Sequence, residues 1–156
     1  MERNDIVAYL RGAPDLVVHA CQELTDEQLH QRPAAGDWSL IELVCHLRDS
    51  AIEEGMRARR MVEEDNPTLE PYDERDRAIE RNYIAEDCPK AMTALRAYLT
   101  GYAYQLERFS EAEWERPGFH PEDGPVSVRM RAELEVEHTQ AHLAQMRATR
   151  EAIVGP

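Results

Sequence analysis

The chain of 156 residues carries a formal net charge of −13, with 42% hydrophobic and 31% charged residues. This length suits a single domain over residues 1–156, and the composition is typical of a globular protein rather than a disordered one. The negative charge argues against nucleic acid and anionic membrane surfaces as partners, because both are bound through Lys and Arg. No apolar run is long enough to cross a bilayer and no signal peptide is visible, so we expect a cytoplasmic protein.

The first quarter of the chain predicts one long helix and one short helix. Asp5 to Leu24 is helical in pattern, with a break or kink expected near Gly12-Ala13-Pro14. Thr25 can cap a short helix that ends before Pro33, and residues 34–37 form a loop.

The second long helix begins at a capping box and leads into the longest connection. Ser39 and Glu42 have the spacing of that motif, and the helix runs to about Asp65. Residues 66–71 form a cluster of helix breakers, and the polar stretch 72–87 is expected to hold one short helix. We expect this connection to cross the molecule from end to end.

Two more long helices complete the pattern. One starts at Asp87-Cys-Pro-Lys and runs to about Phe109, and the other is capped by Ser127 and runs to about Ile153. Residues 111–125, rich in Pro and Gly, are expected to form a loop, and no segment shows the alternation of a strand. Four long helices with one long crossover predict an all-α protein, a four-helix bundle.

Three histidines are candidate metal ligands. His138 and His142 are spaced i, i+4, so they lie on one face of the last helix, opposite a charged stripe that faces solvent. His46 lies in a polar sector of the second long helix. That sector either faces solvent or faces a wet cavity, and in the second case His46 adds a third imidazole. The alternative for the pair is two buried histidines satisfied by hydrogen bonds.

Other residues of the same sector are candidates for roles around the histidines. Glu53 and Arg57 are the candidate catalytic residues, with Glu53 expected in the cavity and Arg57 as its ion-pair partner. Glu42, Asp49 and Glu53 are expected to include a partner of a ligand imidazole or a substrate contact. His120, in Gly-Phe-His-Pro, is a candidate for binding a cofactor at the mouth of the site.

The three cysteines do not form a disulfide framework. Cys21, Cys45 and Cys88 are odd in number and widely spaced, which favours buried reduced thiols. Cys45 is not favoured as a nucleophile. Its neighbour is His46, and adjacent residues in a helix do not share a face.

Taken together, these motifs resemble the DinB-like (YfiT-like) superfamily over nearly the whole chain. The resemblance lies in Trp38-Ser-Leu-Ile-Glu-Leu-Val-Cys-His46-Leu with Glu53 and Arg57 or Arg59 downstream, in Gly118-Phe-His-Pro-Glu-Asp-Gly-Pro-Val-Ser127, and in Glu137-His138-Thr-Gln-Ala-His142-Leu-Ala-Gln145. One departure is Thr139, where relatives often carry Asp. It removes a carboxylate near the site but none of the three histidines.

The resemblance implies a bundle that holds a divalent metal ion through His46, His138 and His142. Zinc or nickel is the expected ion, and iron or manganese could also bind. Family members of known activity include metal-dependent transferases of low-molecular-weight thiols and a thiol-dependent isomerase. We therefore expect a metal-dependent transferase that adds such a thiol to a small electrophile.

Three alternatives to a transferase stay open. The first is a hydrolase that uses metal-bound hydroxide, the second is a stress-response protein that binds metal without turnover, and the third is a metal-free bundle used for assembly. The expected partner is a small-molecule substrate, with no nucleic acid and no membrane. A homodimer is the assembly considered.

Overall fold

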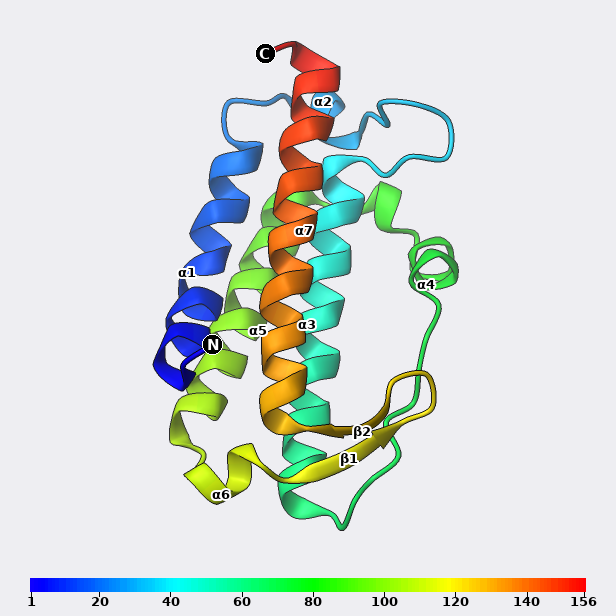
Figure 1. Cartoon of the computed structure of the whole chain (residues 1–156). Coiled ribbons are helices and arrows are strands. Elements are labelled where there is room, and N and C mark those ends of the chain that lie inside the picture. Colours follow the sequence, from blue (N-terminus) through cyan, green and yellow to red (C-terminus); the bar gives the residue numbers. More distant parts are fainter.

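Four long helices form a bundle in the computed structural model, which describes all 156 residues. They are α1 (Arg3–Cys21), α3 (Leu40–Glu63), α5 (Cys88–Arg108) and α7 (Val128–Val154). Helix α3 packs against α5 and α7, and α1 packs against the same two helices. Helices α3 and α5 run in one direction while α1 and α7 run in the other (Figure 1). The predicted four-helix bundle is confirmed.

The long helices begin at the predicted caps. The Ser39 hydroxyl accepts a hydrogen bond from the Glu42 amide, and the Glu42 carboxylate accepts one from the Ser39 amide, so the capping box of α3 is complete. Asp87 caps α5 and Ser127 caps α7 through their side chains. Thr25 caps the short helix α2 (Asp26–His30) with the same reciprocal arrangement as Ser39.

Of the break or kink expected near Gly12-Ala13-Pro14, the break does not occur. Helix α1 continues through Pro14, and it ends at Cys21 instead of Leu24. A proline interrupts only part of the hydrogen-bond ladder, and the apolar face of α1 buries Ile6, Leu10 and other side chains against the bundle. That packing holds the helix together across the proline.

The crossover between α3 and α5 contains α4 (Glu74–Glu80) and a 3-10 turn, η1 (Tyr83–Ala85). It leaves the lower end of α3 and climbs past the side of the bundle to the upper end of α5 (Figure 1). The expected path from end to end, with one short α-helix, is confirmed, and the 3-10 turn adds to it.

The prediction of a plain loop before the last helix is wrong. Residues 111–127 form a short helix, α6 (Glu111–Trp114), and an antiparallel hairpin of β1 (Pro117–His120) and β2 (Gly124–Ser127). The strand β1 also bonds to the start of the crossover, because the Phe119 amide donates to Pro67 O at 2.9 Å and the Leu69 amide donates to Phe119 O at 2.7 Å. The hairpin is thus fixed to the crossover on one side of the bundle.

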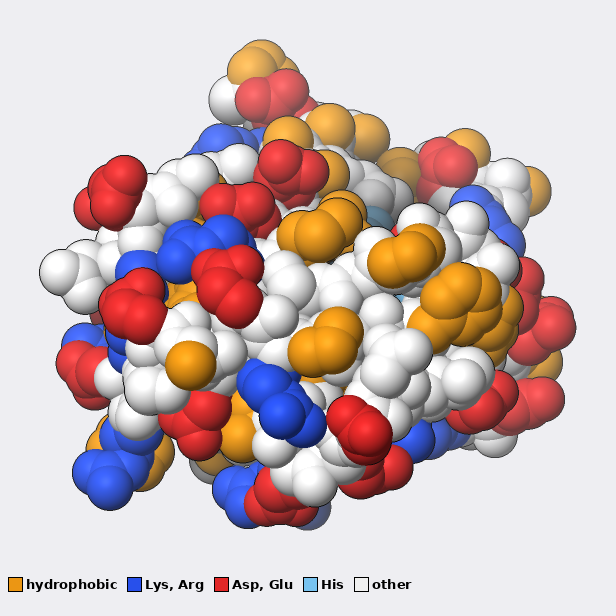
Figure 2. Space-filling view, turned by 60° about the horizontal axis from the view of Figure 1, so that its bottom comes forward, with side chains coloured by type: hydrophobic (Ala, Val, Ile, Leu, Met, Phe, Trp, Pro, Cys, Tyr) orange, Lys and Arg blue, Asp and Glu red, His pale blue; other side chains and the backbone are white.

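A single hydrophobic core fills the bundle. It includes Cys21, Cys45 and Cys88, which are buried and free, as the sequence predicted. None of the helices combines the length and apolar character that crossing a membrane requires. The surface at the hairpin end mixes Lys and Arg with Asp and Glu, and histidine shows only as small patches deep between other side chains (Figure 2).

Candidate metal centre

Three imidazoles converge between α3 and α7. His46 Nε2 lies 2.9 Å from His138 Nε2, which lies 3.0 Å from His142 Nε2. The His46 side chain is 3% exposed, so its sector of α3 faces the interior at this point and not solvent. The Trp38 ring covers the group, with its centroid 5.0 Å from that of His46 and 6.4 Å from that of His142.

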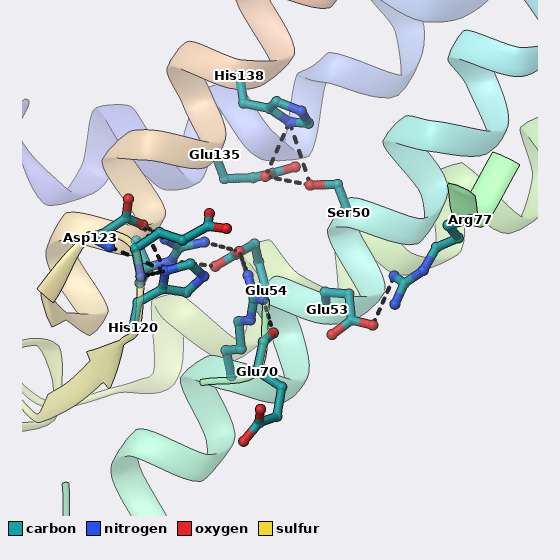
Figure 3. A network of polar contacts seen from close by, with 12 residues as sticks. Ser50, Glu53, Glu54, Glu70, Arg77, His120, Asp123, Glu135 and His138 are labelled. Carbon is teal, nitrogen blue, oxygen red and sulfur yellow. Dashed lines mark hydrogen bonds and ion pairs between the residues drawn. The ribbon is translucent and has the colours of Figure 1, made fainter. Parts of the chain in front are cut away.

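Neighbouring oxygens fix which nitrogen of each half-buried ring carries the proton. His142 Nδ1 donates to Gln145 Oε1 at 2.9 Å. His138 Nδ1 faces Glu135 Oε2 at 3.5 Å, and Glu135 Oε2 also accepts a hydrogen bond from Ser50 Oγ at 2.8 Å (Figure 3). Since a neutral imidazole has one N–H, the Nε2 atom of His142 presents a lone pair to His138, and the neutral form of His138 with its proton on Nδ1 presents one to His46.

The surroundings keep two of the rings neutral at ordinary pH. Burial and the neighbouring His138 and His142 lower the pKa of His46 to about 2. Burial and the neighbouring His138 likewise lower the pKa of His142. Burial also lowers the pKa of His138, but the Glu135 carboxylate outweighs it, so the pKa of His138 is raised. A carboxylate behind an imidazole is a common support for a metal ligand.

These residues fit a divalent metal ion. Each hydrogen bond between two rings needs one proton between its two nitrogens. Because ring protons are held at Nδ1 by other partners, too few protons remain for three converging Nε2 atoms. A cation is the partner that satisfies several lone pairs at once, and three neutral imidazoles are a common zinc ligand set. His46, His138 and His142 are the residues that would hold it. Glu74 extends the group, since one ligand atom of each of the four residues lies within 4.8 Å of the others.

A cavity of about 590 Å³ opens beside the histidines. It is bounded by α3, the crossover, the hairpin and α7, and most of its lining is polar or charged. The lining residues are His46, Ser50, Glu54, Arg57, Pro71, Tyr72, Asp73, Glu74, His120, Glu122, Asp123, Arg131, Leu134, Glu135 and His138.

A buried ion network forms one wall of this cavity. Glu54 accepts hydrogen bonds from Arg57 at 2.7 Å and from Arg131 through both of its oxygens. Arg131 also donates to Asp123 at 2.9 Å, and Asp123 lies 3.4 Å from His120 Nδ1. The network therefore joins α3, α7 and the hairpin, and it supplies two guanidinium groups to the cavity wall.

The two catalytic candidates are placed differently from what the sequence suggested. Arg57 lines the cavity, but the expected ion pair with Glu53 is not formed, because Arg57 pairs with Glu54. Glu53 lies outside the cavity lining and pairs with Arg77 at 2.9 Å (Figure 3). Residues 53 and 54 point about 100° apart on a helix, so choosing the wrong neighbour changes the face.

The remaining candidates divide into one that lines the cavity and two that support the bundle. His120 lies in the cavity wall. Glu42, the acidic residue of the capping box, pairs with Arg32 at 2.8 Å. Asp49 pairs with Arg48 and Arg81, both at 2.8 Å. Both carboxylates are buried but neither lines the cavity, so their positions give them a structural part.

Three carboxylates near the histidines were missed from the sequence: Glu54, Glu74 and Glu135. Glu135 precedes His138 by three residues, so helical spacing places it beside the ligand pair and could have revealed it. Glu54 is two turns beyond His46 on α3, so helical spacing could have revealed it as well. Glu74 carries no such signal, because only the path of the crossover brings it to the histidines.

The fold and the site define a four-helix bundle with a histidine-lined cavity between two of its helices and the crossover. A family model for the DinB superfamily matches residues 9–146. The chain therefore belongs to the DinB superfamily, as its motifs suggested.

Curated relatives and a solved structure agree with this assignment. A protein of Oceanobacillus iheyensis is 26% identical over 92% of this chain and 83% of its own length, and one of Bacillus licheniformis is 28% identical over 90% and 81%. Both are provisionally named as metal-dependent hydrolases. The structure of YfiT from Bacillus subtilis, described as "a probable metal-dependent hydrolase with an unusual four-helix bundle topology", superposes with a TM-score of 0.88 at 21% identity, covering 95% of this chain and 85% of YfiT. This likeness shows the fold.

Proposed function

We propose that this protein is a divalent-metal-dependent enzyme that transfers a low-molecular-weight thiol to a small electrophile. The observation that carries the proposal is the convergence of three imidazole Nε2 atoms beside a cavity of about 590 Å³. When bound, a divalent ion supplies a Lewis acid that can keep a thiol ionised near neutral pH. Zinc or nickel is the expected ion. The thiol comes from the family resemblance and the metal-binding geometry from the chain itself.

The residues around the histidines hold them in a binding orientation. Glu135 Oε2 lies 3.5 Å from His138 Nδ1 and is itself held by Ser50, while Gln145 Oε1 accepts from His142 Nδ1 at 2.9 Å. Burial raises the pKa of Glu135, although the neighbouring His138 lowers it. Such partners fix the ring and raise its basicity as a ligand.

The cavity favours a small polar substrate. Its volume lies within the usual range for small-molecule sites. Arg57 and Arg131 are the charged donors in its wall, and both are already engaged by Glu54. Arg57, which lines the cavity, remains our candidate for contacting an anionic part of the substrate, whereas Glu53 lies outside the lining and would act only through Arg77. The net charge of −13 disfavours a polyanionic substrate.

Hydrolysis is the second candidate reaction. The relatives from Oceanobacillus iheyensis and Bacillus licheniformis carry the name of metal-dependent hydrolases. The His138 side chain is 27% exposed, so solvent water reaches the histidines. The same ligand set therefore serves either nucleophile, and a metal-binding role without turnover would use it too.

Metal content tests the first part of the proposal. Protein purified without a histidine tag should carry about one divalent ion per chain, and His142→Ala should lose most of it. His19→Ala is the matched control, because His19 is exposed on α1 and away from the cavity. Metal-free protein after growth with zinc, nickel and manganese would refute the site.

Turnover tests the reaction. Metal-loaded protein should consume a generic electrophile only when bacillithiol, mycothiol or glutathione is added. Consumption of an ester or amide without any thiol would favour hydrolysis instead. Metal-loaded protein that reacts under neither condition would favour the non-catalytic role.

A further inference from the structure

The crossover presents one carboxylate to the three histidines. Glu74 Oε2 lies 3.4 Å from His46 Nε2, on the side of the histidines that faces the crossover. This separation is longer than a good N–H···O hydrogen bond, which measures about 2.7–3.2 Å. It matches two ligand atoms that share one ion at about 2.1 Å and a tetrahedral angle, which lie about 3.4 Å apart.

The helix that carries Glu74 is capped at its start and is tied to the rest of the chain by two arginines that follow Glu74. Asp73 caps the helix by accepting from the amides of Arg75 and Asp76, both at 2.9 Å. Arg75 donates to Gly36 O at 3.2 Å, and Arg77 pairs with Glu53 of α3 at 2.9 Å. The backbone around Glu74 therefore has a set position above the histidines.

The Glu74 side chain itself remains half in solvent. It is 50% exposed, compared with 3% for the His46 ring it faces. No Lys or Arg side chain is paired with its carboxylate, and the His46 ring that it faces is neutral. A carboxylate in this position can exchange between an ion and water with little loss of solvation, which a buried charge cannot do.

Resting on the proposed function, we infer that Glu74 is a fourth protein ligand that an incoming thiol displaces. In the resting protein its carboxylate closes the histidine site from the crossover side. When a thiol binds, its proton goes to solvent, its sulfur takes the position of the Glu74 oxygen, and the carboxylate moves into water. The crossover thus supplies a replaceable ligand, while α3 and α7 supply the permanent ones.

The first test is the affinity for zinc alone, measured on the full chain by competition with a chromogenic chelator. Glu74→Gln should weaken binding at least about tenfold, and Glu74→Ala at least as much. Asp76→Asn is the matched control, because it removes the same charge from an exposed position of the same helix and should leave affinity unchanged. Equal affinity losses in Glu74→Gln and Asp76→Asn would show that Glu74 affects zinc binding only through its charge at long range. That result would overturn the inference.

The second test is displacement by a thiol in cobalt-substituted protein. Titration with 2-mercaptoethanol should produce sulfur-to-cobalt charge-transfer absorption. Half-saturation should come at a lower thiol concentration in Glu74→Gln than in the unaltered protein or in Asp76→Asn, because no carboxylate competes. Identical titration midpoints in all three would overturn displacement. Circular dichroism and thermal melting establish that the variants are folded.

The proposed function and this inference fail in different ways. Protein that binds no zinc overturns both. Protein that binds zinc, loses it in His142→Ala and keeps it fully in Glu74→Gln overturns only the role of Glu74.

Discussion

Glu54 lies at the centre of the buried ion network in the cavity wall. Its carboxylate is buried between two guanidinium groups, those of Arg57 and Arg131, and hydrogen bonds to each. Arg57 also donates to Glu70 O, and Arg131 donates to Asp123, so both cations have further acceptors. The central carboxylate nevertheless is the group that allows two arginines to lie side by side away from water.

Replacing Glu54 by Gln should therefore destabilise the protein strongly. The variant keeps the shape of the side chain but leaves two buried cations facing each other, so we expect a loss of about 3 kcal/mol in the free energy of unfolding. Urea denaturation measures it. Glu63→Gln is the control, because Glu63 pairs with Arg59 on the exposed surface of the same helix and should change stability by less than about 1 kcal/mol. Similar losses in the two variants would show that the buried network contributes no more to stability than an exposed ion pair does.

The same residues mark the limit of prediction from the sequence at this scale. The spacing of His138 and His142 indicated that both rings share a face, and the structure brings His46 to them. The pairing of Arg57 with Glu54, or of Glu53 with Arg77, depends on which side of α3 faces α7 and which faces α4. Sequence spacing gives relative positions on one helix but not the partner on another.

At the scale of the elements, the capping box of α3 contains a titratable group. Burial raises the pKa of Glu42, but hydrogen bonds from Arg32 and Ser39 outweigh burial, so its pKa lies below the ordinary value of 4.5. A carboxyl group whose pKa is lower in the folded state stabilises the fold above the unfolded pKa. That contribution is lost as the pH falls through the folded pKa.

We therefore expect Glu42→Gln to be less stable than the unaltered protein at neutral pH. The difference in the free energy of unfolding should hold down to about pH 4.5 and shrink below it, because protonated Glu42 resembles Gln. Urea denaturation over a series of pH values measures this difference. Glu151→Gln, at an exposed position of α7, should give a difference close to zero throughout. A constant difference down to the acid transition would contradict the prediction.

Two glycines should respond to alanine with opposite signs. At Gly118 in β1 an added Cβ would lie 2.8 Å from Met61 Sδ and 3.4 Å from Pro67 O, so Gly118→Ala should destabilise the protein by about 1–3 kcal/mol. At Gly12 in α1 nothing lies within 4 Å of the added atom, so Gly12→Ala should stabilise it by about 0.5–1 kcal/mol through helix propensity. Thermal melting distinguishes the two, and a stabilised Gly118→Ala would mean that the hairpin does not pack closely on α3.

The helices were predictable and the hairpin was not, for reasons visible in these elements. The long helices are marked by caps such as Ser39, Asp87 and Ser127, and by apolar periodicity over many turns. Each strand has four residues and contains proline and glycine. This is too short for the alternation of polar and apolar residues that marks a strand to be recognised. The strands form because they pair with each other and because β1 bonds to residues 67–69, which lie about fifty positions earlier.

At the scale of the whole molecule, the bundle supplies the histidines and the irregular segments complete the cavity. Helices α3 and α7 carry the three rings, while the crossover and the hairpin supply Tyr72, Glu74 and His120 on the other sides. An ion held by the rings would connect α3 to α7 at a point where the core between them is polar. It would bind only the folded chain, because the ligands lie 92 positions apart or more across the two helices.

Metal binding should consequently raise the melting temperature. A ligand at about one hundred times its dissociation constant stabilises the folded state by about 2.7 kcal/mol. For a chain of this size that corresponds to an increase of about 5–10 °C, and a chelator should reverse it. With a net charge of −13 the surface could also attract cations, so the variants are needed to assign the effect. Zinc should raise the melting temperature of His19→Ala as much as that of the unaltered protein and should leave His142→Ala unchanged. An equal increase in His142→Ala would place the ion on the acidic surface, because that variant lacks one of the three converging rings.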